Sequence, residues 1–236
     1  MKVLSYNIWN YAGGWTRRRE LLLDIMRQES PDIIALQEVR HGWHDRRGQN
    51  QARWLAEQLG YHWVYRPASI FWPVPLVVEG LAFLTKEPIR RFAAFAVPQL
   101  RWAGPSRVIL HARVGEVDLY NVHFPLTQRA RVVEAQQIVR IAEERSCGPA
   151  LVMGDFNADA EQEPMQIFWL AGFVDLWDQL APPAQPVVWP SDRRIDYILG
   201  GSGRNWEGTI VTVGDCPNEA GENPSDHPGL LAQLRW

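Results

Sequence analysis

The sequence predicts an α/β (α+β) fold in which two mixed β-sheets pack face to face and helices cover their outer sides. Three observations support this prediction. Predicted strands outnumber predicted helices, tight hairpin turns alternate with helical connections, and both faces of the predicted sheets need cover. The turn at Gly115-Glu116, for example, joins two apolar strands, as in an antiparallel pair. No repeat, low-complexity run or linker divides the chain, so we expect one domain over residues 1–236.

The N-terminal half alternates short strands with helices. Residues 3–7 form the first predicted strand, and Thr16 is expected to cap a helix. That helix buries one apolar stripe and ends at Pro31-Asp32. Residues 33–36 are a second buried strand, and residues 51–59 are a helix that Gly60 ends. Further strands are predicted at residues 61–66, 76–85 and 89–97, the last at a sheet edge. The apolar stripe of the first helix consists of Leu21, Leu22, Ile25 and Met26.

The C-terminal half begins with the hairpin strands at residues 107–114 and 117–122. A long helix at residues 127–145 leads into a short apolar strand at residues 150–153, which Gly154 ends. A helix at residues 161–171 and an exposed proline-rich loop at residues 181–190 follow. The last predicted strands cover residues 193–199, 206–213 and 230–234.

Composition and charge restrict the class of protein. The chain has a formal net charge of −3, which argues against a broad basic face that coats nucleic acid but leaves room for a local phosphate site. No apolar run is long enough to span a membrane, and no leader-like stretch opens the chain, so we expect a cytoplasmic protein without stable membrane insertion. Cys147 and Cys216 lack the spacing of a zinc site or a disulfide framework.

The stretch at residues 149–157 carries the first functional signal. After the apolar strand and Gly154, the chain presents Asp155 and Asn157, which alternation places on the same side just past a strand end. A carboxylate that takes a proton or holds a cation, beside an amide that donates to developing negative oxygens, suits phosphate chemistry. The alternative is an ordinary turn, because Gly, Asp and Asn are common turn formers.

Other polar side chains occupy similar places. Glu79 and Asp196 lie inside apolar strands, where an acid is costly to bury unless it is paired. We therefore pair Glu79 with His123 and Asp196 with His227 as a hypothesis, which would orient each imidazole and favour its charged form. The polar residues at or just beyond apolar strands are Asn7, Glu38, His123, Asp155, Asn157, Asp226 and His227.

Each of these residues alone has an ordinary explanation. Glu38 could be a surface acid, His123 and His227 could be loop histidines, and the Asp226-His227 pair could cap a turn. Their joint occurrence in one domain-sized chain instead favours a single site.

Six motifs follow one another along the chain: Tyr6-Asn7, Leu36-Gln37-Glu38, Asn121-Val122-His123, Gly154-Asp155-Phe156-Asn157, Arg194-Ile195-Asp196-Tyr197-Ile198 and Ser225-Asp226-His227-Pro228. This ordered set resembles the endonuclease/exonuclease/phosphatase family, which includes pancreatic-type deoxyribonucleases, exonuclease III-like repair enzymes, sphingomyelinases and inositol phosphatases. The resemblance extends from Asn7 to His227. It implies a four-layered α/β sandwich that hydrolyses phosphate esters with a divalent metal, usually Mg²⁺, with Mn²⁺ as a possible substitute.

The resemblance also implies a role for each residue. Glu38 is similar to the principal metal ligand with Asn7 beside it, and Asp226 to a residue that holds this metal or a second one. Asp155 is similar to the group that orients or deprotonates the attacking water, and Asn157 to the amide that holds a phosphate oxygen. His227, oriented by Asp196, and His123, oriented by Glu79, would contact the phosphate. Apurinic repair endonucleases of the family carry tyrosine at the position of His123, so the chain is more similar to the deoxyribonuclease-like and sphingomyelinase-like branches.

Three functions remain open at this stage. The acidic net charge favours a phosphodiesterase for a small or lipid-headgroup substrate, with an apolar rim at the site. A nuclease is the alternative, with arginines around the site. A binding domain without catalysis is disfavoured because none of the motif residues is substituted. We expect a monomer whose partner is a phosphate-ester substrate, with nucleic acid as the other possible partner. The rim residues would be Trp9, Phe71, Trp72 and Trp102, and the arginines Arg40, Arg46, Arg47, Arg101, Arg193 and Arg194.

Overall fold

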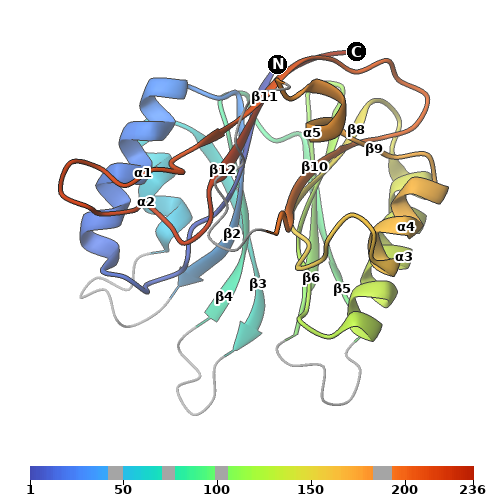
Figure 1. The fold of residues 1–236 in the computed structure, drawn as a ribbon, viewed down its shortest axis with the longest axis horizontal. Helices are drawn as coiled ribbons and strands as arrows, with labels where there is room; N and C mark the ends of the chain where they lie inside the picture. Colours follow the sequence, from blue (N-terminus) through green and yellow to red (C-terminus); the bar gives the residue numbers. More distant parts are fainter. Residues whose placement is uncertain (42–49, 71–77, 99–105, 183–192) are drawn as a thin grey trace.

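A computed structural model of the protein describes residues 1–41, 50–70, 78–98, 106–182 and 193–236. These residues form two six-stranded sheets that face each other between outer helices (Figure 1). Sheet A has the order β11-β12-β1-β2-β4-β3, and sheet B has the order β5-β6-β7-β8-β10-β9. The predicted sandwich of two mixed sheets is confirmed, because β1–β2 and β7–β8 are parallel pairs whereas the remaining pairs are antiparallel.

The strand bounds are close to those expected from the apolar runs. In sheet A the strands are β1 (Lys2–Asn7), β2 (Ile33–His41), β3 (His62–Ile70), β4 (Val78–Thr85), β11 (Glu207–Val213) and β12 (Gly229–Arg235). In sheet B they are β5 (Arg91–Ala96), β6 (Val108–Val114), β7 (Val117–His123), β8 (Ala150–Asp155), β9 (Val174–Asp175) and β10 (Asp196–Gly200).

The helices form the outer layers. α1 (Trp15–Glu29) and α2 (Gln51–Leu59) cover sheet A, and α3 (Gln128–Arg145) and α4 (Glu163–Leu170) cover sheet B (Figure 1). The short α5 spans Leu176–Leu180. Within the described ranges, the chain forms no helix both long and apolar enough to cross a membrane.

Two sequence-based expectations need correction. The N-cap of α1 is Gly14, not Thr16, because the chain enters the helix through a left-handed residue with φ 81° and Thr16 already lies in the first turn. The short β9 and α5 were not predicted, since two and five residues are too few to show a periodic pattern.

Apolar side chains fill three layers. The central layer lies between the sheets and includes Val3, Phe83, Leu119 and Met153. A second layer joins sheet B to α3 and α4, and a third joins sheet A to α1 and α2. Burial of these faces supplies the main driving force for folding, but it is non-directional and leaves the relative placement of the sheets to more specific contacts.

Asn121 provides such a contact across the two sheets. From β7 it donates hydrogen bonds to the carbonyl oxygens of Leu36 (3.0 Å) and Ala82 (2.9 Å) in sheet A. Its Oδ1 accepts from Gln37 Nε2 at 2.8 Å. Both side chains are fully buried, so each bond satisfies groups that water cannot reach. This network fixes the sheets to each other immediately below the edge that carries the polar residues.

All the polar segments reach one edge of the sandwich. The parallel strands β1, β2, β7 and β8 end there, and their antiparallel neighbours begin there. Asp196, for example, opens β10 directly opposite Asp155. Asp226 and His227 do not follow a strand as expected. They precede β12, which runs antiparallel to β1 and so starts at the edge where β1 ends.

We predict that Asn121→Ala destabilises the fold by roughly 2–4 kcal/mol, because it removes the hydrogen bonds to the buried Leu36 and Ala82 carbonyl groups and the shortest bond of the Gln37 amide. Denaturant unfolding at equilibrium measures this change. The exposed Asn205 gives a matched control, and Asn205→Ala should stay within about 0.5 kcal/mol of the parent protein. A loss no larger than that of the control would contradict the cross-sheet role of Asn121.

Candidate active site

Glu38 is placed by an irregularity in β2. The register between β2 and β4 shifts between Leu36 and Val39, and Glu38 has a left-handed backbone with φ 55°. Such a conformation is unfavourable for a residue with a Cβ and is typical of functional sites. The sequence predicted that the strand ends near Leu36, whereas β2 continues past this bulge to His41.

Two amides hold the Glu38 carboxylate. Asn7 Nδ2 donates to Oε1 at 3.4 Å, and Asn10 Nδ2 donates to Oε2 at 2.7 Å. Asn7 Nδ2 also donates to Asp155 Oδ2 at 3.1 Å, so the fully buried Asn7 bridges the acids of the two sheets. Asn7 Oδ1 accepts from the Trp9 amide at 3.1 Å, which leaves the nitrogen of Asn7, rather than its oxygen, facing Glu38.

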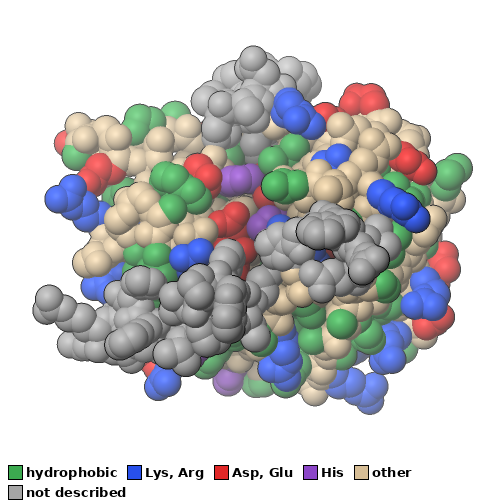
Figure 2. Space-filling view, turned by 90° about the horizontal axis from the view of Figure 1, so that it is seen from below, with side chains coloured by type: hydrophobic (Ala, Val, Ile, Leu, Met, Phe, Trp, Pro, Cys, Tyr) green, Lys and Arg blue, Asp and Glu red, His purple; other side chains and the backbone are tan. Residues whose placement is uncertain are grey.

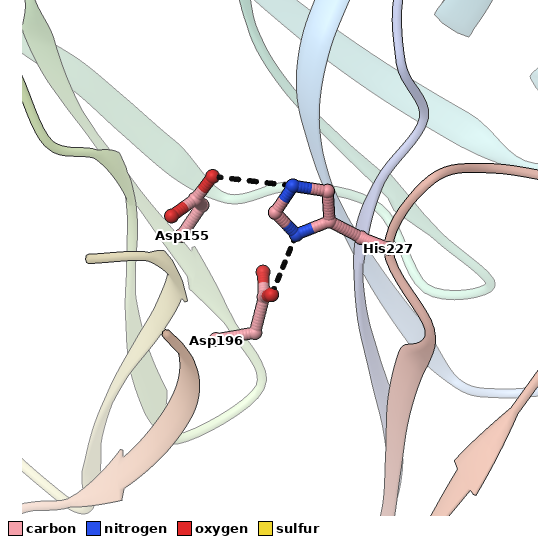
Figure 3. Close-up of side chains that lie close together, drawn as sticks. All are labelled: Asp155, Asp196 and His227. Carbon is pink, nitrogen blue, oxygen red and sulfur yellow. Dashed lines mark hydrogen bonds and ion pairs between the residues drawn. The ribbon is translucent and has the colours of Figure 1, made fainter. Parts of the chain in front are cut away.

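Asp155, Asp196 and His227 form the centre of the site (Figure 3). His227 Nδ1 lies 2.7 Å from Asp196 Oδ2, as the predicted pairing required. The other ring nitrogen, Nε2, lies 3.8 Å from Asp155 Oδ2. That distance is too long for a hydrogen bond, so the side of the ring facing Asp155 keeps its capacity to bond another group.

His123 and Asn157 both lie close to Asp155. His123 Nε2 is 3.7 Å from Asp155 Oδ2, similar to the distance from His227. The Asn157 backbone amide donates to Asp155 Oδ1 at 2.9 Å, and its side-chain amide donates to the Phe124 carbonyl at 2.9 Å. Asn157 has a left-handed φ of 48°, so a second site residue occupies an unfavourable backbone region.

Burial gives these groups different proton affinities. Burial and then the charge of Asp196 raise the pKa of Asp155, despite the opposing charge of His227. Burial opposes the charged form of His227, but the charge and hydrogen bond of Asp196 outweigh it and raise the pKa to about 10. Burial, followed by the charges of Arg107 and His227, keeps the pKa of His123 well below its usual range. His227 is therefore a cation and His123 is neutral near pH 7, so the expectation that both imidazoles favour the charged form is wrong for His123.

Glu79 does not form the predicted hydrogen bond with His123. Its carboxylate faces Arg40 at 3.9 Å and Arg107 at 4.0 Å. Glu79, Arg107 and His123 line a small cavity of about 10 Å³, so the acid and the imidazole share surroundings without direct contact. Burial and then the charge of Glu38 raise the pKa of Glu79 to about 7. The arginines were the stronger partners because their charge is permanent.

Asp226 completes the acidic side of the site. Ser225 Oγ donates to the Asn7 carbonyl at 2.6 Å, which places the segment of Asp226 against the end of β1. Partial burial and the charge of Glu38 raise the pKa of Asp226, although His227 opposes this. Glu38 and Asp226 thus offer carboxylate oxygens to a cation. Asp155, Asp196 and His227 are a second group, with one possible ligand atom from each within 4.8 Å of the others.

Sequence reasoning missed three residues of this site. Asn10 holds Glu38, Arg107 faces Glu79, and Arg18 supports the loop after β1. A charged residue four positions before Leu22, on the buried face of α1, was an available signal for Arg18. Asn10 gave none, because its contact depends on a left-handed turn with φ 37°.

The site lies on one face of the molecule. Figure 2 shows histidine and acidic side chains gathered in a hollow at the middle of this face. Of the expected rim and arginine residues, Phe71, Trp72, Trp102, Arg46, Arg47 and Arg101 lie outside the described residues.

The remaining arginines of that set already have acidic partners. Arg40 faces Glu79, and Arg193 lies 2.7 Å from Asp159. Arg194 contacts Asp175 at 2.5 Å and also approaches Asp178.

Comparisons with known proteins bear on the family and the fold of the chain. The family model described as "Endonuclease/Exonuclease/phosphatase family" matches residues 4–227. A comparison with curated proteins gives no match.

Several solved structures share the fold. A protein of unknown function from Enterococcus faecalis V583 is 22% identical with a TM-score of 0.79, over 100% of this chain and 99% of its own. A mannosyl-6-phosphatase from Bacteroides thetaiotaomicron VPI-5482 is 19% identical with a TM-score of 0.76, over 100% of both chains. The human nocturnin catalytic domain with bound sulfate is 20% identical with a TM-score of 0.77, over 100% of this chain and 93% of its own. At these identities the similarity shows the fold alone.

The His227–Asp196 pair gives a prediction that NMR can check. The His227 imidazole should titrate with a pKa of about 10, and Asp196→Asn should lower that value toward about 6.5 because the paired charge is lost. Since the folded-state pKa is raised, the pair stabilises the fold fully below about pH 6.5, and this contribution is lost as the pH rises through about 10. The exposed Asp24→Asn serves as control. An unchanged His227 midpoint in Asp196→Asn would contradict the assignment.

Proposed function

Because the chain belongs to the endonuclease/exonuclease/phosphatase family, we propose that it hydrolyses phosphate esters with a divalent metal ion, by in-line attack of water on phosphorus. One observation carries this proposal. Asp155, with a raised pKa, lies between two imidazoles and is joined through Asn7 to the carboxylate of Glu38. A group that takes a proton, a cationic donor and oxygen ligands for a cation therefore meet at one edge of the sandwich. We also propose that residues 1–236 act as one domain, since both sheets supply parts of this site.

The acidic side of the site fits a metal ion. Glu38 and Asp226 are close enough for the charge of Glu38 to raise the pKa of Asp226, and a cation between them would relieve that repulsion. Mg²⁺ binds through one or two carboxylates and keeps several waters, and Mn²⁺ accepts similar oxygen ligands. Bound there, the ion would polarise the phosphoryl group and neutralise developing charge. The hydrogen bonds of Asn7 favour a bridging role between Glu38 and Asp155, and its ligation of the metal stays a prediction.

The residues around Asp155 and His227 are suited to proton transfer. Asp155 has the raised proton affinity needed to take a proton from the attacking water. His227, cationic and oriented by Asp196, would donate to a phosphate oxygen. His123 and the Asn157 amide would supply further hydrogen bonds to the developing negative charge. We assign Asp155, Asp196 and His227 to this role rather than to metal binding, because the cationic imidazole of His227 has no free lone pair for a metal and its Nδ1 is bonded to Asp196 at 2.7 Å.

Glu79 would act on this centre indirectly. It faces Arg107, and the charge of Arg107 adds to the larger effect of burial in lowering the pKa of His123. Glu79 would therefore place Arg107 so that His123 stays neutral.

The substrate that we favour is a small or lipid-headgroup phosphodiester. Arg40, Arg193 and Arg194 each face a carboxylate of the protein, which reduces the positive charge free to track a nucleic acid backbone. A nuclease with the same site is the alternative.

A magnesium-dependent hydrolysis panel tests the proposal. It compares an aryl phosphodiester, sphingomyelin, an aryl monoester, plasmid DNA and RNA. We expect the aryl diester or sphingomyelin to be turned over fastest. Plasmid nicking or RNA cleavage as the dominant activity would favour a nuclease. Turnover of none of them, with metal bound, would favour a binding domain.

We predict that Glu38→Gln loses metal affinity and rate together, since the substitution removes a charged oxygen ligand. Isothermal titration with Mg²⁺ or Mn²⁺ should show affinity at least about tenfold weaker. Glu116→Gln, in the exposed β6–β7 turn, is the matched control and should bind the metal as the parent does. Full activity in Glu38→Gln would rule out its assignment as a metal ligand.

For His227→Ala we expect a rate loss on the order of 100-fold or more with metal binding retained, because a contact made to the transition state is removed. Steady-state kinetics at saturating Mg²⁺ measure the loss. His62→Ala changes an exposed histidine at the start of β3 and should leave the rate unchanged. A similar rate in both variants would exclude His227 from the reaction.

A further inference from the structure

Arg18 is a buried cation with an unusual set of partners. It lies on the inner face of α1 and only 3% of it is exposed. Within the described ranges, no carboxylate lies at ion-pair distance from it. A buried charge is costly unless hydrogen bonds compensate it. Here the compensation comes from backbone carbonyl groups of two separate segments.

All five N–H groups of the guanidinium are used. Nε donates to Ala12 O at 2.9 Å, and Nη2 donates to Trp9 O at 3.1 Å and Asn10 O at 2.9 Å. Nη1 donates to Ile8 O at 2.9 Å and to Pro224 O at 2.7 Å. An arginine has five N–H donors, so none is left for a substrate. Arg18 can therefore influence the site only through the segments it holds.

The first segment, residues 8–12, controls Glu38. Trp9 and Asn10 have left-handed backbones with φ 54° and 37°, which few residues adopt unless their surroundings hold them. Asn10 O accepts from Gln51 Nε2 at 2.7 Å as well as from Arg18, and Gln51 Oε1 accepts from the Arg40 amide at 2.7 Å. This network aims the Asn10 amide at Glu38 Oε2.

The second segment, residues 224–227, carries Asp226 and His227. Pro224, whose carbonyl oxygen Arg18 binds, lies 206 positions away in the sequence. The next residue, Ser225, donates to Asn7 O. Asp226 and Glu38 are near enough for their charges to favour the cationic form of Arg18 against the effect of burial on its pKa. Arg18 thus binds both the segment that carries Asp226 and the segment whose Asn10 holds Glu38.

We propose that Arg18 is a positioning residue: it joins residues 8–12 to residues 224–227 and so sets the spacing of Glu38 and Asp226 for a divalent cation. The inference rests on the proposed function for the identity of that cation. Lysine cannot replace arginine here, because its ammonium has three donors at one point and cannot reach both segments in the geometry of a planar guanidinium.

Arg18→Lys in the full-length protein tests the proposal by two measurements. Hydrogen exchange should become faster in residues 8–12 and 224–227 together, although the two segments are far apart in the sequence. Mn²⁺ titration without substrate should show roughly tenfold weaker binding, as expected when a group that orients metal ligands is lost. The control is Arg113→Lys, a partly buried arginine paired with Asp118 at the end of the sheet away from the site, which should change neither measurement.

Unchanged exchange, faster exchange in one segment only, or unchanged Mn²⁺ affinity would overturn the proposal. If Arg18→Lys does not fold, Asn10→Gly replaces it, since glycine keeps the left-handed turn and removes the side chain that holds Glu38 and that also accepts a hydrogen bond from the Ala12 N–H. Mn²⁺ binding should again weaken roughly tenfold, and parental affinity would overturn the proposal. A parent protein that binds no Mn²⁺ would refute the metal-dependent function but not the positioning role. Hydrogen exchange would then decide that role, measured in residues 8–12 and 224–227 of Arg18→Lys or around Glu38 in Asn10→Gly.

Discussion

The hydrogen bonds between Asn121 in sheet B and Leu36, Gln37 and Ala82 in sheet A hold the two halves of the site at a fixed separation. Apolar burial alone brings the sheets together but sets no particular register between them. Two further contacts cross the same boundary above Asn121. Asn7 reaches Asp155, and His227 reaches Asp196. Sheet A and its connections thus supply the acidic side of the site, sheet B supplies the base, and neither half is complete without the other.

The charge states of the site residues depend on this placement. The site lies at one edge of a hydrophobic sandwich, and Asp155 and His123 are buried there although polar groups surround them. Burial alone would favour neutral forms of both. Of the two histidines, only His227 is kept charged by the carboxylate of Asp196, because Asp196 bonds that ring directly. Two histidines with similar distances to Asp155 consequently have different charges, which lets one donate as a cation and the other remain a neutral hydrogen-bonding group.

Several site residues also occupy backbone conformations that are unfavourable in isolation. Glu38, Asn157, Trp9 and Asn10 all have positive φ. Such residues keep their geometry only when neighbouring contacts over-determine it. Phe124 O accepts a hydrogen bond from the Asn157 side-chain amide, and the carbonyl groups of Ile8, Trp9, Asn10 and Ala12 accept hydrogen bonds from Arg18. The packed sandwich therefore keeps these strained and charged residues in place at its edge.

The sequence by itself determined the fold class, nearly every strand and helix, and the set of polar segments that meet at one edge. Those features depend on local patterns: apolar runs, turn residues and the motifs at 7, 38, 123, 155 and 226–227. Tertiary structure alone decided the partners. It gave Glu79 two arginines instead of His123, turned the Asn7 nitrogen toward two carboxylates and kept His123 neutral. It also placed Arg18 against the carbonyl group of Pro224, 206 positions away in the sequence. Sequence shows which groups must find a partner, but the choice among partners follows from distances and burial that exist only once the two sheets have packed.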